Sequence, residues 1–176
     1  GIGSQSAGSN STGSDNIAIG TQALFQNNIN NYNIGIGGSC MYFSNYSIGD
    51  THNVGIGYST QYYSVYGRHN TSVGNYTLGN GSAVGNLGGT GNTAMGFRCL
   101  SATTTAAYNT AIGWQAGSRL KSGRSNIIIG QNAQVHDGAG DYQLNIGDVI
   151  YGQVNVTSGQ TAGKIVVSGS TMINNN

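Results

Sequence analysis

The sequence predicts an all-β protein, a parallel β-solenoid (β-roll) of about nine 17-residue coils that assembles as a homotrimer. A five-residue phrase beginning at Asn16 and ending at Gly20 returns along the chain. Its closing glycines fall at 3, 20, 37, 57, 74, 96, 113, 130 and 147, so six of the eight intervals are 17 residues. The residues inside each phrase alternate as in a strand, and no stretch has helical periodicity. A fixed period of this length is typical of stacked repeat architectures.

Each copy of the phrase carries an asparagine, a large apolar residue and a glycine. The copies comprise Asn16, Ile19, Gly20, Asn33, Ile36, Gly37, Asn53, Ile56, Gly57, Asn70, Val73, Gly74, Asn92, Met95, Gly96, Asn109, Ile112, Gly113, Asn126, Ile129 and Gly130, with Ile146 and Gly147 in a last, altered copy. The glycine indicates a turn with positive φ or a contact too close for a Cβ. The asparagine suits the preceding bend, where its amide can bond to neighbouring backbone.

The two faces of the phrase differ in size, because successive strand side chains point to opposite sides. The residue before the glycine, such as Ile19, is large, and we expect it to fill the core of the coil. The residue before that is small, as in Ala18 and Gly35. We expect this thin face to contact sister chains around a common axis, most simply as a three-fold homotrimer.

A second small residue follows three positions after each glycine. It is Ala23, Cys40, Thr60, Thr77, Cys99, Ala116 or Ala133. We expect a second short strand here, so that one coil is strand, tight turn, strand and polar loop. A single copy cannot bury its apolar residues, whereas stacked copies can, at about 4.8 Å per coil. Cys40 and Cys99 are three glycine intervals apart, too far for a disulfide, and both are expected to be buried.

The repeat region spans residues 1–152, and residues 153–176 form a C-terminal β cap or tip. Alternating runs at 154–156, 164–168 and 171–173, with turns at Gly159 and Gly169, predict a small β-meander. Solenoid ends need such atypical caps because an open strand edge invites aggregation.

Composition excludes several classes of function. The 176 residues include 31 glycines and no proline, only 6% are charged, and the formal net charge is +1. This balance implies no general attraction to nucleic acid or to an anionic membrane. No apolar run approaches the roughly 20 residues of a membrane span, so no membrane insertion is expected. The chain begins within a repeat, and we expect it to be a fragment or a processed piece.

Aromatic residues are concentrated in the first half of the chain. In repeat register Phe25, Tyr42 and Tyr62 share one position, and Phe43 and Tyr63 share the next, so their rings should stack along the rod. A structural ladder is one interpretation. The other is a carbohydrate platform, whose candidate binding residues are Tyr58, Tyr62, Tyr63, Tyr66, Arg68 and His69, with Trp114 further along.

No catalytic residues, metal ligands or cofactors are assigned. Glycoside hydrolysis needs two suitably spaced carboxylates, and the acidic residues are only Asp15, Asp50, Asp137, Asp141 and Asp148. The three histidines, His52, His69 and His136, lack metal-ligand spacing. The cations Arg119, Lys121 and Arg124 are expected on a solvated loop. An ice-binding solenoid is a further class, but the outward positions are too mixed for a regular threonine array.

The phrase Asn-x-(Ala/Gly)-(Ile/Val)-Gly, followed by x-x-(Ala/Ser), resembles the head repeat of trimeric autotransporter adhesins. Similar repeats occur in bacteriophage tail fibres and tail spikes, and the resemblance covers residues 1–151. Residues 143–152 resemble the end of a tail-fibre shaft, upstream of a removable chaperone domain. The period of 17 is longer than the adhesin family's shortest coil, and no stalk heptads follow.

This resemblance implies a trimeric, left-handed β-roll. It implies a phage tail fibre or spike segment in the extracellular virion tail, with other tail proteins and a bacterial surface glycan or outer-membrane receptor as partners. The alternative is the head of a bacterial trimeric adhesin at the cell surface. A polysaccharide-degrading tail spike is a weaker alternative.

Overall fold

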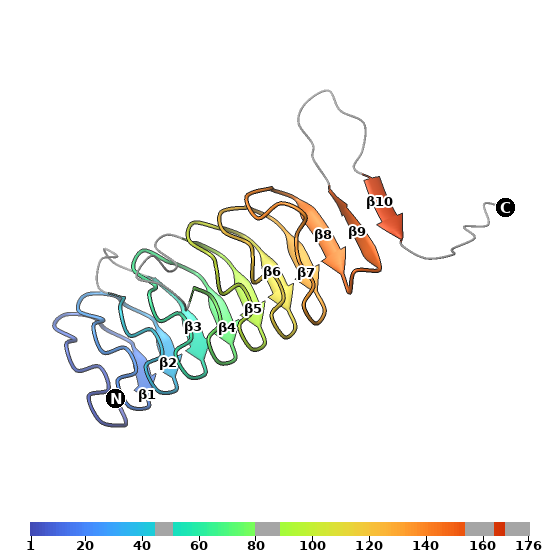
Figure 1. Cartoon of the computed structure of the whole chain (residues 1–176). Helices are drawn as coiled ribbons and strands as arrows, with labels where there is room; N and C mark the ends of the chain where they lie inside the picture. The colour runs from blue at the N-terminus through green and yellow to red at the C-terminus, as the bar shows by residue number, and fades with distance from the viewer. Residues whose placement is uncertain (45–50, 80–88, 154–163, 168–176) are drawn as a thin grey trace.

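The computed structural model describes residues 1–44, 51–79, 89–153 and 164–167. Its strands form one ten-stranded sheet in chain order, and no helix occurs among the described residues. The strands are β1 (Ile17–Ile19), β2 (Ile34–Ile36), β3 (Val54–Ile56), β4 (Thr71–Val73), β5 (Thr93–Met95), β6 (Thr110–Ile112), β7 (Ile127–Ile129), β8 (Gln143–Ile146), β9 (Ile150–Gln153) and β10 (Lys164–Val167). Figure 1 shows coils stacked along one axis, with the strands aligned on one side.

Strands β1 to β8 pair in parallel with equivalent residues opposite each other. Ile17 pairs with Ile34, and Thr93 pairs with Thr110, so the register follows the sequence repeat. This confirms the predicted parallel β-solenoid. It has about seven turns rather than nine, preceded by a partial winding in which Ile2 bridges Ile19.

The prediction of which strand face points inward is wrong. Ala18 is only 3% exposed, whereas its neighbour Ile17 is 48% exposed. The same pattern recurs in β2 to β7, whose small or middle residue is buried and whose outer two residues are half-buried or exposed. The large residues Ile19, Ile36, Ile56, Val73, Met95, Ile112, Ile129 and Ile146 therefore face out of the coil. The thin face lines the interior and is not available to a sister chain.

The interior takes small strand residues because the opposite wall of the coil already fills it. Leu24 Cγ lies 3.0 Å from the point where a Cβ on Gly35 would stand. A Cβ on Gly55 would lie 2.8 Å from both Cys40 Sγ and Met41 Cε. The coil core is one side chain deep, so a large residue in the turn requires a small one in the strand.

The segment after each glycine is a turn and not the second strand that we predicted. Alternate residues in it have left-handed backbone conformations, as in Gln22 (φ 57°) followed by Leu24 (φ 50°). A strand needs φ near −120° throughout. The left-handed residues curl the chain so that Leu24 points into the coil, where it is fully buried. The small residues three positions after the glycines are buried.

The core contains two apolar clusters separated by a polar layer. One cluster is formed around Leu24 and Met41, and the other extends from Leu78 to Val135. In the layer between them, Gln61 Nε2 donates to Ser72 Oγ at 2.8 Å and to the Val54 carbonyl at 2.9 Å. Gln61 occupies the repeat position of Leu24, so its amide is satisfied inside the rod as buried polar groups must be.

Asparagine side chains form a hydrogen-bonded ladder at the start of the strands. Asn109 Oδ1 accepts the backbone N–H of Asn126 at 2.9 Å, and Asn109 Nδ2 donates to the Gly123 carbonyl at 2.9 Å. The Oδ1 atoms of the other repeat asparagines likewise accept the backbone N–H of the next repeat asparagine from Asn16 onward, and Asn126 Oδ1 accepts the Gln143 N–H. The predicted backbone bonding of these amides is confirmed, and it connects one coil to the next.

The parallel stacking ends at β8. Strand β9 pairs antiparallel with β8, and β10 pairs antiparallel with β9. Part of the predicted C-terminal meander is therefore present, with β10 inside the run predicted at 164–168. The runs predicted at 154–156 and 171–173 lie outside the described residues. Cys40 and Cys99 are buried free thiols, as predicted.

Candidate functional site

The outer face of the sheet is apolar along the rod. We call it the apolar face. It consists of the first and third residues of β1 to β7 together with Leu144 and Ile146 of β8. Threonine occupies three of the first positions, in β4, β5 and β6, and all the other side chains are Ile, Val, Leu or Met. Contiguous apolar surface of this kind usually marks an interaction site.

Aromatic residues form a stacked group that we call the tyrosine ladder: Phe25, Tyr42, Phe43, Tyr62 and Tyr63. The Tyr42 ring lies 5.1 Å from Phe25 and 5.2 Å from Tyr62, centroid to centroid. Phe43 and Tyr63 stack at 5.0 Å with an interplanar angle of 3°. The rings stack as the repeat register predicts. Their faces cover one another, and all five side chains are half-buried.

Tyr62 lies in the middle of the tyrosine ladder, and its surroundings change its acidity. Burial raises the pKa of Tyr62, and the neighbouring Tyr63, Tyr42 and Tyr58 raise it further. The shift favours the protonated phenol, which can donate a hydrogen bond.

A second column lies at the bend before the strands. Tyr32 stacks on His52 at 4.8 Å, and His52 stacks on His69 at 5.3 Å. These side chains are exposed. The column is interrupted at the equivalent residue Gly91, where a Cβ would lie 2.7 Å from the ring of Tyr108.

A third group, which we call the edge column, follows the repeat glycines. It contains Tyr58, Tyr76, Phe97 and Trp114. Tyr58 meets Tyr76 edge-on at 5.4 Å, and Tyr76 meets Phe97 edge-on at 6.0 Å. Phe97 and Trp114 are nearly parallel, 16° apart, with centroids separated by 6.2 Å. The Arg98 guanidinium carbon lies 5.7 Å from the Phe97 centroid, within cation–π range.

The structure divides the seven predicted binding residues among these columns. Tyr62 and Tyr63 belong to the tyrosine ladder, His69 to the bend column, and Tyr58 and Trp114 to the edge column. The other two, Tyr66 and Arg68, are exposed, and Arg68 bridges Thr90 through its backbone.

Sequence reasoning did not assign Tyr32, His52, Tyr76 or Arg98 to an aromatic column. For Tyr32 and His52 the repeat register was the available signal. Tyr76 lies two residues after Gly74, so the register does not align it with Tyr58 or Phe97. Tyr32, His52 and His69 each directly precede a repeat asparagine, and Phe97 follows its glycine as Trp114 does.

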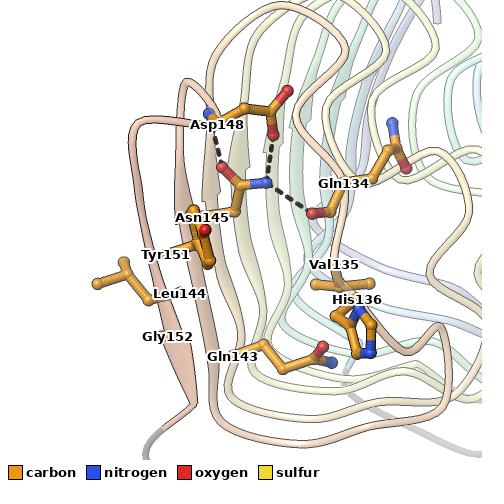
Figure 2. A pocket seen from close by; sticks show the side chains of 9 residues that line it. All are labelled: Gln134, Val135, His136, Gln143, Leu144, Asn145, Asp148, Tyr151 and Gly152. Atoms are coloured by element: carbon orange, nitrogen blue, oxygen red, sulfur yellow. Dashed lines mark hydrogen bonds between the residues drawn. The ribbon is translucent and has the colours of Figure 1, made fainter. Parts of the chain in front are cut away.

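A pocket of about 380 Å³ lies beside the end of the parallel stack. Figure 2 shows the Asn145 amide between the Gln134 carbonyl and the Asp148 side chain. Asn145 Nδ2 donates to these groups at 2.7 and 2.6 Å, and Asn145 Oδ1 accepts the Asp148 N–H at 2.9 Å. Asp148 is the single carboxylate among the lining residues. The pocket thus does not present the carboxylate pair that glycoside hydrolysis uses.

Other charged groups are dispersed. Arg119, Lys121 and Arg124 are exposed, and Asp141 Oδ1 accepts the Arg124 N–H at 2.7 Å. Within the described ranges no three His, Cys, Asp or Glu side chains are grouped as metal ligands, and no helix could cross a membrane. Comparison of the chain with protein-family models, with curated proteins and with solved structures finds no match.

Proposed function

We propose that this chain is a segment of a homotrimeric fibre that attaches to a bacterial surface, as in a bacteriophage tail fibre or tail spike. The observation that carries the assembly is the apolar face. It follows one side of the sheet through successive coils, and side chains such as Ile17, Met95 and Ile112 are exposed there. An apolar surface repeated at every coil fits best against a surface with the same repeat.

Cyclic association places identical apolar faces around a common axis parallel to the rod. In such an arrangement each coil meets the same coil of its sister chains, so the hydrophobic contact extends along the sheet. This contact uses the apolar face, which is on the opposite side of the strands from the thin face that we expected from the sequence. The proposed number of chains, three, is unchanged. The three threonines of β4 to β6 would lie at the same contact.

The receptor-binding role is supported by the resemblance of the repeats and by the aromatic columns outside the apolar face. Exposed aromatic rings with adjacent polar side chains suit a saccharide, which offers apolar ring faces and hydroxyl groups. The surface target we propose is a bacterial glycan or outer-membrane receptor, and the location is the virion tail. The head of a bacterial trimeric adhesin is the second candidate, because the same repeat resemblance favours it.

Light scattering after size-exclusion chromatography tests the assembly. We expect a mass of three times the 18.0 kDa of one chain. Ile112→Lys should lower this mass toward one chain, because a lysine would be buried without a partner at the contact. Tyr108→Lys, at a position 63% exposed outside the apolar face, is the matched control and should stay trimeric. A monomeric wild-type chain would overturn the assembly.

Adsorption to bacteria tests the function. Fluorescently labelled wild-type chain should bind cells of a susceptible strain, and the monomeric Ile112→Lys chain should bind at least about ten-fold more weakly because avidity is lost. No binding by the trimer across a broad strain panel would contradict a receptor-binding role.

A further inference from the structure

Trp114 is the last ring of the edge column, because the next coil has no aromatic residue at the equivalent position. The repeat position after Gly113 is Trp114, and the position after Gly130 is Gln131. Rings inside a column are contacted from both neighbouring coils, as Phe97 is by Tyr76 and Trp114. Trp114 has a ring partner on one side only among the described residues.

The geometry of the Phe97–Trp114 pair leaves indole surface open. A centroid separation of 6.2 Å with nearly parallel rings corresponds to an offset stack, in which each ring covers only part of the other. Trp114 is 45% exposed and Phe97 is 36% exposed. The pair therefore presents a stepped aromatic surface to solvent. This differs from the tyrosine ladder, whose rings are half-buried and closely stacked.

Polar residues of the adjacent coil lie beside this surface. The Asn132 N–H donates to the Trp114 carbonyl at 2.8 Å, which places Asn132 beside Trp114 on the next coil. The Gln115 N–H bonds in the same way to the Phe97 carbonyl at 2.8 Å. Gln131 and Asn132 are exposed, so their amides are accessible.

Arg98 supplies the positive charge at this site. Its side chain is exposed and lies against the Phe97 ring. Among the described residues the guanidinium forms no ion pair with a carboxylate. The guanidinium is planar, and its N–H groups can bind a carboxylate through two hydrogen bonds.

We propose that Trp114, Phe97 and Arg98, with the amides of Gln131 and Asn132, form a subsite for an acidic saccharide. A pyranose ring would stack on Trp114, and a carboxylate of the same or the adjacent sugar would bind Arg98. The inference rests on the proposed receptor-binding function and names the ligand class for one place on the rod. The ligand lies beside the coils that contain β5 to β7.

Trp114 is the one tryptophan of the chain, so its fluorescence reports directly on this subsite. The trimeric wild-type chain is titrated with oligosaccharides that carry uronate or sialate and with neutral hexose oligomers of equal length. We expect a saturable change in Trp114 emission with at least one acidic oligosaccharide and a weaker response to its neutral counterpart. Added salt should weaken the acidic ligand because the charge contact is screened.

Variants separate stacking from charge. By calorimetry, Trp114→Ala should weaken binding of the acidic oligosaccharide roughly ten- to thirty-fold, as truncation of an aromatic hot spot does. Arg98→Gln should remove the preference for the acidic over the neutral oligosaccharide. Tyr108→Ala, which truncates an exposed ring outside the edge column, is the control and should bind like wild type. Folding of each variant is checked by its mass and thermal transition.

Three outcomes would overturn the subsite: no emission change with any acidic oligosaccharide, protection of Trp114 from iodide quenching in the unliganded trimer, or equal binding by Trp114→Ala and wild type. Cell adsorption distinguishes these failures from failure of the proposed function. If the trimer adsorbs to cells and Trp114→Ala adsorbs equally, the subsite is wrong and the receptor-binding function stands. If the wild-type trimer adsorbs to no strain, the receptor-binding function itself fails.

Discussion

Replacing Gly113 with alanine should destabilise the solenoid strongly, because the coils approach closely at the repeat glycines. Gly113 has φ 135°, far from the left-handed helical region that other residues can occupy. A Cβ there would lie 2.5 Å from the Gly130 carbonyl oxygen and 2.7 Å from its carbonyl carbon. Both obstacles are backbone atoms, so neither can be relieved by a side-chain rotation.

The expected cost has two parts. An unfavourable backbone conformation costs about 1–3 kcal/mol, and overpacking a close contact costs about 1–3 kcal/mol more. The sum is about 2–6 kcal/mol. For a chain of this length, 1 kcal/mol lowers the melting temperature by about 2–4 °C. We expect Gly113→Ala to melt roughly 5–20 °C below wild type by circular dichroism, at one fixed protein concentration because assembly stabilises the fold.

Gly147 offers a matched control within the same repeat position. It has φ 59°, and nothing lies within 4 Å of the place where its Cβ would stand. Gly147→Ala should therefore cost only about 1–2 kcal/mol, the penalty of a left-handed non-glycine residue. If Gly113→Ala melts as high as Gly147→Ala, the argument that close approach of the coils requires glycine is refuted.

Two further predictions concern the core. A Cβ on Gly117 would lie 2.7 Å from Leu100 Cδ2 and 2.8 Å from Ile128 Cδ1, so Ile128 occupies part of the space that leucine fills in other coils. Ile128→Ala should lower the free energy of unfolding by about 2–5 kcal/mol, and Gly117→Leu should lower it by about 1–3 kcal/mol. In urea unfolding, the double variant should be at least about 1 kcal/mol more stable than the sum of the two single effects predicts. Strict additivity would contradict this packing. Burial raises the pKa of the Cys40 and Cys99 thiols to about 12. A thiol reagent at pH 8 should modify neither cysteine in the native state and both cysteines in denaturant. The free energy of unfolding should fall as pH rises from 9 toward 12, because only the thiols of the unfolded chain ionise in that range. Rapid labelling of the native protein would disprove their burial.

The repeat could be read from the sequence because each coil must present the same groups to the next. The interval of 17 residues and the recurring Asn and Gly correctly predicted the parallel register, in which Ile17 lies opposite Ile34. The register also predicted that Tyr42 stacks on Tyr62. These are consequences of stacking alone, and they hold for any cross-section of the coil.

The sequence did not predict in the same way which side chains of a coil point inward. Alternation separates Ala18 from Ile17 and Ile19, but it does not say which side is enclosed. We assigned the larger side chains to the core on hydrophobicity. The left-handed conformations of Leu24 and its equivalents bring large side chains into the coil from the opposite wall, so space remains only for small strand residues.

For the candidate binding residues, too, position in the sequence and position in the structure gave different groupings. Sequence proximity grouped Tyr58, Tyr62, Tyr63, Tyr66, Arg68 and His69, yet several point from different corners of the coil into separate columns. Residues 17 positions apart, such as Phe97 and Trp114, are neighbours instead. The sequence by itself determined that equal positions stack. Only the tertiary structure decided which positions face inward, outward or a common edge, because that depends on how the turn residues bend the chain around a core one side chain deep.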